Sequence, residues 1–393
     1  MSWPMVKLKD CCEVVGGATP KRNIASYWEG DIPWITPKDI SNLNSPFIYE
    51  APEHISSAGY KAAATYMLPV GTILLTSRAP IGNVAIAGLE LCTNQGFKSL
   101  IPGKNVHNKY LYHCIKKFSP KLELLGNGAT FKEVSKTVVE NFEIPLPPFE
   151  EQIRIARILD KCDGIRQKRE QAIKLVDDYL RATFLDIFGD PVENPKGWGV
   201  ASLLDYGSFK NGMNFTKGES GAFLRCLGVG DFKSLTTITC MDNIGEIELN
   251  TLPSDDYLLK DGDIVFVRSN GNKALVGRCL TIYPGNEKVT FSGFCIRYRI
   301  ENTAITPEYL NFLFRTPSMK QQMLSGGQGA NIQNISQGTL SALRIPVPPL
   351  DKQLAFARLV DFRASILKKQ YDKMSESEKL FDALTGDFFI FNE

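Results

Sequence analysis

The stretch IPLPPFEEQIRIARILD at residues 144–160 decides the organisation of this chain, because it recurs 201 residues later as IPVPPLDKQLAFARLVD at 345–361. Eight of the seventeen aligned residues are identical. The same shift places GNGATFKEVS at 126–135 over GQGANIQNIS at 327–336. A period of about 200 residues is far too long for a solenoid repeat, so the sequence predicts a duplicated domain.

Other paired stretches extend the repeat with small changes of register. WITPKDI at 34–40 resembles CLGVGDF at 226–232, VGTILL at 70–75 resembles DGDIVF at 261–266, and QGFKSLI at 95–101 resembles SGFCIRY at 292–298. Each half therefore passes through short strands and a glycine loop before its Pro-Pro pair. We expect a mixed α/β fold with two copies of one domain.

A charged segment follows each Pro-Pro pair, and its pattern is that of a long helix. Proline suits the residues at or just before the first helical turn, and acidic side chains such as Glu150 and Asp351 suit the positive end of the helix dipole. Over 155–187 and 356–388, seven of ten positions spaced alternately by four and three are apolar. These are coiled-coil-like seams, and the Gly189-Asp190-Pro191 sequence ends the first helix.

Two segments of equal period in one chain most simply pair with each other, in antiparallel orientation, and act as a spacer between the domains. The alternative is that they dimerise the chain or pack only on its own domains. We expect domains at 1–148 and 191–349, and helices at 149–190 and 350–393. The residues predicted for helix pairing or partner docking are Gln152, Ile155, Leu159, Ile173, Val176, Leu180, Gln353, Phe356, Val360, Leu367, Phe381 and Leu384.

Composition narrows the functional classes. The formal net charge is only +2, so binding to nucleic acid would require an asymmetric arrangement of charge. Nine cysteines without a C-x-x-C pair fit reduced thiols in a cytoplasmic protein, and three histidines in this arrangement predict no metal site. No apolar run approaches the ~18 residues that span a bilayer, and no signal peptide is evident.

The residues LSGGQ at 324–328 match the signature of ATP-binding-cassette ATPases, but the chain lacks the phosphate-binding loop that must accompany them. The nearest candidate, PGKN at 102–105, has Asn105 where Ser or Thr is required. LSGGQ begins the second glycine loop, whose counterpart in the first half does not contain the signature. We therefore reject an ATPase.

Two other enzyme classes also lack their chemistry. A DNA amino-methyltransferase needs a polar side chain before Pro-Pro-aromatic, whereas Leu146 and Val347 precede the two Pro-Pro pairs. A metal-dependent nuclease needs clustered carboxylates with a lysine. Asp231 is followed by Lys233, but its counterpart Asp39 has no such lysine, so we interpret both aspartates as strand-end or turn residues.

The duplicated I-P-x-P-P-x-x-x-Q stretches, the FGDP junction at 188–191 and GDIPWITPKDI at 30–40 resemble the specificity subunit of type I restriction-modification systems. The resemblance covers essentially the whole chain. It implies that each large domain recognises one half of a split DNA target, while the helices set the spacing and dock two methyltransferase subunits. Restriction (translocase/nuclease) subunits join that core. The resemblance implies no catalytic residue here; S-adenosylmethionine, ATP and Mg²⁺ would be bound by partners.

Polar loop residues are the candidates for contacting double-stranded DNA, because base edges and phosphates are bound by Arg, Lys, Asn, Gln, Ser and Thr. Loops 77–83 and 268–277 follow corresponding strands and each carries an arginine. The candidates are Lys21, Arg22, Thr36, Lys38, Ser77, Arg78, Asn94, Gln95, Lys210, Asn211, Arg268, Ser269, Asn270, Asn272, Lys273, Gln328 and Asn331. The remaining alternative is a structural assembly protein whose helices associate without sequence-specific DNA binding.

Overall fold

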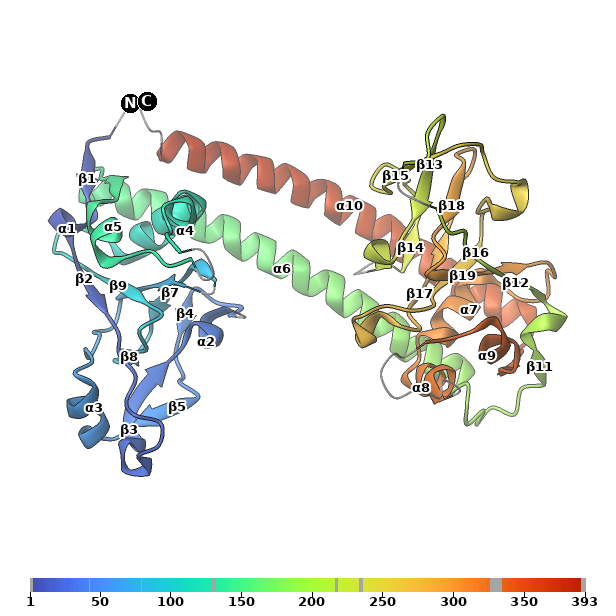
Figure 1. Ribbon diagram of the computed structural model, residues 1–393, viewed down its shortest axis with the longest axis horizontal. Helices are drawn as coiled ribbons and strands as arrows, with labels where there is room; N and C mark the ends of the chain where they lie inside the picture. Colours follow the sequence, from blue (N-terminus) through green and yellow to red (C-terminus); the bar gives the residue numbers. More distant parts are fainter. Residues whose placement is uncertain are drawn as a thin grey trace. The chain divides into compact units, whose positions relative to one another are not determined.

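The computed structural model describes residues 3–41, 43–78, 80–128, 132–215, 218–232, 236–325 and 334–389, except the side chains of 367–382, 384–385 and 387. It forms two compact units (Figure 1). One comprises Met1–Gln171 with Gln370–Glu393, and the other Ala172–Lys369. None of the helices in these described stretches has the length and apolar content to cross a membrane.

The described residues of the first unit form three sheets. The largest has the strand order β2-β9-β6-β7-β4, formed by Cys12–Gly16, Lys98–Pro102, Ile73–Ser77, Ile81–Ala87 and Phe47–Ile48. The second has the order β5-β3-β8, formed by Glu53–Ile55, Trp28–Ile35 and Cys92–Thr93. The third pairs β1, Met5–Lys7, with β10, Glu143–Pro145. The short helices are α1 (Leu8–Cys11), η1 (Ala25–Tyr27), α2 (Pro37–Ser41), α3 (Ser57–Ala63), α4 (Asn108–Leu124) and α5 (Lys136–Asn141).

The second unit repeats these sheets in the same order. Its largest sheet is β12-β19-β16-β17-β14, formed by Gly207–Asn211, Cys295–Ile300, Asp263–Val267, Cys279–Ile282 and Thr237–Ile238. The others are β15-β13-β18 (Glu246–Leu249, Ala222–Leu227, Val289–Phe291) and β11-β20 (Val200–Ser202, Arg344–Pro346). The short helices are η2 (Leu203–Asp205), η3 (Val229–Phe232), η4 (Asp255–Tyr257), η5 (Lys273–Leu275), α7 (Pro307–Phe314), α8 (Pro317–Ser325) and α9 (Gln337–Ser341).

Strand direction and register confirm the predicted duplication and the mixed α/β class. The edge strands β4 and β14 both pair parallel to their neighbours, β7 and β17. On the central strands, Ile73 lies opposite Leu100 as Ile264 lies opposite Tyr298. Mixed sheets with the same unusual parallel edges in both halves indicate one ancestral domain.

The sequence alignment at β9 and β19 was wrong by one residue. Ser77 N donates to Gly96 O at 2.8 Å, whereas the equivalent Arg268 N donates to Phe294 O at 2.8 Å. Phe294, rather than Gly293, therefore matches Gly96. Side chains alternate across a strand, so a slip of one residue changes the face on which a side chain lies. Phe97 is fully buried, whereas Phe294 is 61% exposed.

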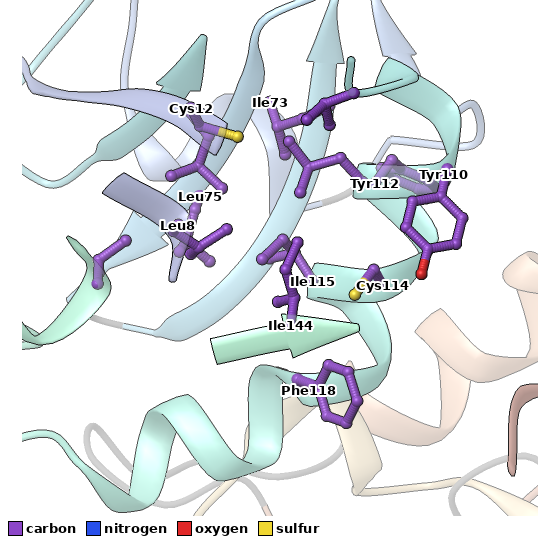
Figure 2. Close-up of a cluster of buried hydrophobic side chains, with 14 of the residues drawn as sticks. Leu8, Cys12, Ile73, Leu75, Tyr110, Tyr112, Cys114, Ile115, Phe118 and Ile144 are labelled. Carbon is purple, nitrogen blue, oxygen red and sulfur yellow. The ribbon is translucent and has the colours of Figure 1, made fainter. Parts of the chain in front are cut away.

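One long helix begins in the core of each unit. In the first, Ile115 and Phe118 of α4 belong to the same buried cluster as Leu8 of α1 and Ile73 of β6 (Figure 2). Helix α6, Phe149–Phe188, follows β10 and adds Ile155 and Leu159 to the same cluster. Helix α10, Leu350–Phe388, follows β20 and adds Phe356 to the corresponding core of the second unit.

The other end of each helix belongs to the other unit's core. Leu180, Phe184 and Phe188, at the end of α6, are buried in the second unit. Within that unit Asp177 pairs with Arg363, and Phe184 packs on Phe356 with ring centroids 5.5 Å apart. Phe184 lies seven residues after Asp177 on α6, whereas its partner Phe356 lies seven residues before Arg363 on α10. The two helices therefore run antiparallel there. Phe389, just after α10, is buried in the first unit against Tyr110.

Most of the residues predicted for helix pairing or partner docking pack on the domains, and Phe356 also contacts Phe184 of the other long helix. Gln152, Ile155 and Leu159 are buried against the first domain, while Leu180, Gln353, Phe356 and Val360 pack in the second unit. Ile173 and Val176 are half-buried. The side chains of Leu367, Phe381 and Leu384 lie outside the described residues. A helix that must cover a domain core uses its apolar stripe for that core first, which a heptad pattern cannot distinguish from helix pairing.

Candidate nucleic-acid interface

The end of β6 presents one arginine-bearing loop in the first unit. Ser77 N donates to Gly96 O, and Val134 N donates to Ser77 O at 2.9 Å. Ser77 is fully buried, and its hydroxyl donates to Gly96 O at 3.1 Å. The neighbouring Arg78 is half-exposed and forms a backbone bridge with Glu133 of the glycine loop. Of the predicted pair, Arg78 is therefore the residue available for a ligand, and Ser77 holds the loop in place.

Two other predicted segments gather beside this loop, around Gly96. Asn94 Oδ1 accepts from Gly96 N at 2.8 Å, and a Cβ on Gly96 would lie 2.8 Å from Pro37 Cγ. Pro37 begins α2, where Lys38 is exposed, and Gln95 is also exposed. The approach between Gly96 and Pro37 requires glycine, because any side chain there would separate the segments. Thr36, Lys38, Asn94, Gln95 and Arg78 are thus brought to one edge of the domain.

Lys21 and Arg22 lie in the turn before η1 instead, where Arg22 reaches the three-stranded sheet. The Arg22 guanidinium donates to both carboxylate oxygens of Glu53, at 2.6 and 2.9 Å, and its Cζ lies 3.9 Å from the ring centroid of Trp28. The hydrogen bonds that Arg22 donates to Glu53 raise the pKa of Arg22 and lower the pKa of Glu53. Arg22 is engaged within the domain, whereas Lys21 is exposed.

The corresponding loop of the second unit follows β16. Ile335 N donates to Arg268 O at 3.0 Å, and Ser269 forms a backbone bridge with Asn334. Asn270 Oδ1 accepts from Asn272 N at 2.7 Å, and Asn272 Oδ1 accepts from Ala274 N at 3.0 Å. The two asparagines therefore shape the turn that leads into η5, where Lys273 is exposed.

The remaining predicted residues of this unit divide into three groups. Lys210 forms an ion pair with Asp256, and its ammonium lies 4.2 Å from the ring centroid of Tyr257. The hydrogen bond from Lys210 lowers the pKa of Asp256. Asn211 is exposed at the end of β12. Gln328 and Asn331 lie outside the described residues, as does most of LSGGQ.

The backbone register shows that the two arginines are not equivalent. Ser77 and Arg268 share one set of backbone contacts, so Arg78 matches Ser269. When the two domains are aligned by these backbone contacts, the two arginines are one position apart. Their side chains therefore leave opposite faces of the chain. The duplicated scaffold thus presents the same chemistry in two geometries.

Phe294 is a candidate that the sequence analysis missed. It lies beside Arg268 through the Arg268 N to Phe294 O hydrogen bond and is 61% exposed. An exposed aromatic ring next to an arginine suits contact with a base or a thymine methyl group. The signal was present in SGF at 292–294, but the alignment placed this ring opposite the buried Phe97.

The two aspartates interpreted as turn residues have that role. Asp39 Oδ2 accepts from Thr36 N at 2.6 Å, and Asp231 Oδ2 accepts from Gly228 N at 2.8 Å. Each carboxylate therefore closes the turn that begins α2 or η3. Lys233, which completed the nuclease-like triplet, lies outside the described residues. Among the residues that are described, no group of three His, Cys, Asp or Glu could hold a metal ion.

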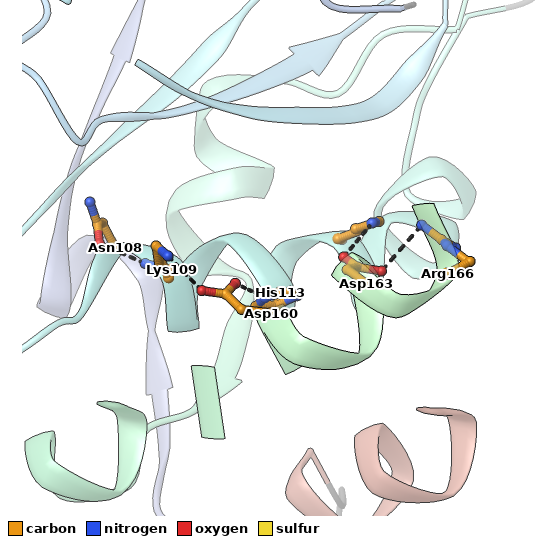
Figure 3. Close-up of polar contacts among 7 residues, drawn as sticks. Asn108, Lys109, His113, Asp160, Asp163 and Arg166 are labelled. Carbon is orange, nitrogen blue, oxygen red and sulfur yellow. Dashed lines mark hydrogen bonds and ion pairs between the residues drawn. The ribbon is translucent and has the colours of Figure 1, made fainter. Parts of the chain in front are cut away.

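A cluster of charges fixes the start of α6 on α4 in the first unit (Figure 3). Asp160 lies 2.5 Å from Lys109 Nζ and 2.9 Å from His113 Nε2. One turn further, Asp163 lies 3.3 Å from Lys116 Nζ and 3.2 Å from an Arg166 nitrogen. Burial acts to raise the pKa of Asp160, but the hydrogen bonds from His113 and Lys109 outweigh it, so the pKa is lowered.

Comparison with known proteins identifies the family. The model described as "Type I restriction modification DNA specificity domain" matches residues 2–175 and 197–373. The chain is 34% identical over 287 residues to the type I restriction enzyme MjaIX specificity subunit of Methanocaldococcus jannaschii, covering 68% of this chain and 66% of that protein. It is 30% identical over 157 residues to the EcoR124I/EcoR124II specificity subunit of Escherichia coli, covering 38% of each. The chain thus spans less than two thirds of the length of these relatives.

Solved structures share the fold. The crystal structure of a type I restriction-modification system S subunit from M. genitalium superposes with a TM-score of 0.56 at 15% identity. The match covers 100% of this chain and 97% of that chain. At this identity the likeness concerns the fold, including its duplicated domain.

Proposed function

Because this chain belongs to the type I restriction modification DNA specificity family, we propose that it is the sequence-recognition subunit of such a complex. The chain acts in a complex with DNA and other subunits. Each large domain contacts one half of a bipartite DNA target, the first through the edge around Gly96 and the second through the loop that follows β16. The family favours this role over that of an assembly protein without DNA specificity.

The observation that carries the proposal is the repetition of one scaffold with different exposed side chains. Sheet order and the backbone contacts of the loop are the same in both halves. The groups on that loop differ: Arg78 in the first, and Arg268, Lys273 and Phe294 in the second. A common frame with different readout groups is what two half-sites of unlike sequence require, because base edges are distinguished by side-chain donors, acceptors and apolar contacts.

The chain's contribution is binding and positioning rather than chemistry. Side chains on the loops contact base edges and phosphates, and the two helices, each anchored at both ends, fix the separation of the half-sites. Exposed faces of α6 and α10 dock methyltransferase subunits, and a restriction subunit completes the complex. These partners bind S-adenosylmethionine, ATP and Mg²⁺ and perform methyl transfer and cleavage. The complex works in the cytoplasm, where the free thiols stay reduced.

Adenine-methylation mapping tests this role. DNA from cells that express this chain with its neighbouring methyltransferase subunit is compared with DNA from cells that express the methyltransferase alone. A split motif with an unspecified spacer, present only when both are expressed, is the expected result. Replacing residues 1–148 with the matching domain of a relative should change one half of the motif and preserve the other. Two proteins that neither co-purify nor methylate would favour the assembly protein.

A further inference from the structure

The second unit contains a cavity of about 250 Å³ that is lined by three arginines. Arg181 comes from α6, Arg315 from the end of α7 and Arg363 from α10. Asp177 is the acidic residue in its wall, and it is bound to Arg363, whose Nη2 lies 2.5 Å from Asp177 Oδ1. The wall therefore carries two more positive charges than negative ones.

Arg181 and Arg315 carry the two positive charges that are in excess in the cavity wall. Within the described part of the chain, no carboxylate forms an ion pair with either of them, because Asp177 is held by Arg363 through both Nε and Nη2. Arg315 is half-buried. A guanidinium stays protonated in proteins, so it cannot relieve its desolvation by losing a proton and instead requires an anion. Burial is the main cause that lowers the pKa of Arg315, and Arg181 and Arg363 also lower it, while Cys279 and Asp177 act in the opposite direction.

Comparison with the first unit shows which acidic residue the second unit lacks. Tyr110 OH donates to Pro145 O and Tyr309 OH donates to Pro346 O, both at 2.7 Å, so these tyrosines are equivalent. Six residues beyond them lie Lys116 and Arg315. Lys116 is neutralised by Asp163 at 3.3 Å. The repeat that aligns Asp160 with Asp361 aligns Asp163 with Ala364.

A proline interrupts the helix of the second unit beside the cavity, two residues after Arg315. Helix α4 runs without a break through Lys117 and Phe118, whereas at the equivalent positions Thr316 lies between α7 and α8 and Pro317 begins α8. The residue before a proline is disfavoured in helical conformation, which accounts for the break. Arg315, Thr316 and Pro317 all line the cavity. The second half therefore has Ala364 where the first half has Asp163, and it has a cavity beside Arg315, the counterpart of the base that Asp163 neutralises.

The other walls of the cavity define the rest of the ligand. Phe184 and Phe312 lie with ring centroids 5.9 Å apart and both face the cavity, as does Leu185. Ligand sites combine such apolar walls with a few converging polar groups. A volume of 250 Å³ is smaller than the roughly 300–1,000 Å³ of sites for drug-sized molecules. It suits one amino-acid side chain or a small organic acid.

We propose that this cavity binds a carboxylate or phosphate carried on a small apolar body, and that the anion occupies the role that Asp163 has in the first unit. Arg315 and Arg181 contact the anion, since planar guanidinium groups match carboxylate and phosphate in two-point hydrogen bonds. Phe184 and Phe312 contact the apolar part. The anion comes either from an acidic side chain of a partner subunit or from a free small acid. DNA recognition does not require this site.

Titration calorimetry of the full-length chain with phenyl phosphate tests the proposal, because this probe combines a phosphate with one aromatic ring. We expect saturable binding in the millimolar range. Arg315→Gln should weaken it by about tenfold or more, the loss expected for a charge-assisted contact. Ala364→Asp places a carboxylate at the exposed position of α10 that corresponds to Asp163 in the repeat, and it should weaken binding. Ala364→Asn, of the same size without charge, should leave binding unchanged.

The thermal unfolding of the same variants gives a second readout. Ala364→Asp should raise the melting temperature of the second unit relative to Ala364→Asn, since it neutralises Arg315 without a ligand. The proposal is overturned if the wild-type chain shows no saturable binding, or if Arg315→Gln binds phenyl phosphate as tightly as the wild type does. Neither result depends on DNA methylation, so failure of the site is distinct from failure of the recognition role.

A third measurement identifies the source of the anion, and it rests on the proposed function because it uses the complex with the methyltransferase subunit. If a partner side chain fills the cavity, the complex should not bind phenyl phosphate, and Ala364→Asp should weaken association of the subunits. If a small acid is the ligand, the complex should bind the probe as the isolated chain does. Both outcomes support an anion site.

Discussion

Gln152 and Gln353 make the same three hydrogen bonds in the two halves of the protein. Gln152 Oε1 accepts from His107 N at 2.8 Å, and its Nε2 donates to Asn105 O and Pro147 O at 3.0 and 2.9 Å. Gln353 repeats this pattern with Thr306 N at 3.0 Å, Ala304 O at 3.1 Å and Pro348 O at 2.8 Å. Both side chains are buried. Each glutamine joins the first turn of a long helix to the loop before α4 or α7, and only an amide can donate and accept there.

Gln152→Glu should therefore destabilise the first unit by about 2–3 kcal/mol, because a carboxylate facing two carbonyl oxygens leaves buried acceptors unsatisfied. Urea unfolding followed by tryptophan fluorescence measures this, since three of the four tryptophans lie in the first half. Gln353→Glu is the matched control and should act on the second unit, where hydrogen exchange can detect it. Equal stability of Gln152→Glu and the wild type would show that the three bonds contribute little.

Asp160→Asn should lower the free energy of unfolding of the first unit at neutral pH. The variant should also lose less of this free energy in acid than the wild type does. The pKa of Asp160 is lowered in the folded state, so its contribution is complete above the unfolded value of about 3.9 and disappears as pH falls through the folded value. The difference in unfolding free energy between wild type and variant should thus shrink below about pH 4. Urea midpoints from pH 7 to pH 3 measure it.

The repeat supplies the control for that experiment. Asp361, the counterpart of Asp160, is exposed and forms no ion pair with any residue that the structure describes. Asp361→Asn should leave both the midpoint and its pH dependence unchanged. A difference for Asp160→Asn that stays constant down to pH 3 would contradict an ionic role for this carboxylate.

Phe184→Ala should destabilise the second unit by about 3–5 kcal/mol, although the residue lies on the helix that begins in the first unit. The Phe184 ring is 1% exposed and packs on Phe188, Tyr309 and Phe356. Hydrogen exchange resolved by unit is the measurement, with greatest loss of protection expected in residues 191–349. Leu175→Ala, at an exposed position on the same helix, is the control. Loss of protection confined to residues 1–148 would overturn this assignment.

Arg268→Ala should weaken binding of the assembled complex to its cognate duplex. If Arg268 contacts a guanine through two hydrogen bonds, discrimination at one base pair should fall by roughly 1–3 kcal/mol. If it contacts a phosphate, all sequences should bind more weakly and the salt dependence should decrease. Binding curves at several salt concentrations on cognate and mismatched duplexes distinguish these cases. An unchanged set of curves would remove Arg268 from the interface.

Phe294→Ser tests the aromatic residue that neighbours Arg268. Because the ring is exposed, the substitution should leave stability of the second unit unchanged while lowering affinity for the cognate site. Phe223→Ser, at another exposed phenylalanine of the same unit, is the control and should have no effect on DNA binding. Equal losses for both variants would indicate a nonspecific surface effect.

The sequence by itself determined the duplication, the mixed α/β class and the two long helices, because repeated residues and apolar periodicity are local properties of the chain. It also identified Asp39 and Asp231 as turn residues from their equivalent positions. These inferences needed no knowledge of which residues pack together in the folded protein. Backbone propensity and the pattern of apolar positions along the sequence were sufficient.

Tertiary structure decided which partner each residue contacts. It showed that Ile155 and Leu159 cover a domain core, that Ser77 is buried while Arg78 is exposed, and that Phe294 faces solvent. A one-residue slip between two strands reverses side-chain direction without changing composition, so sequence comparison could not detect it. Likewise, Arg315 and Arg181 line one cavity only because folding brings the end of α7 and α6 together, which depends on packing between segments distant in the chain.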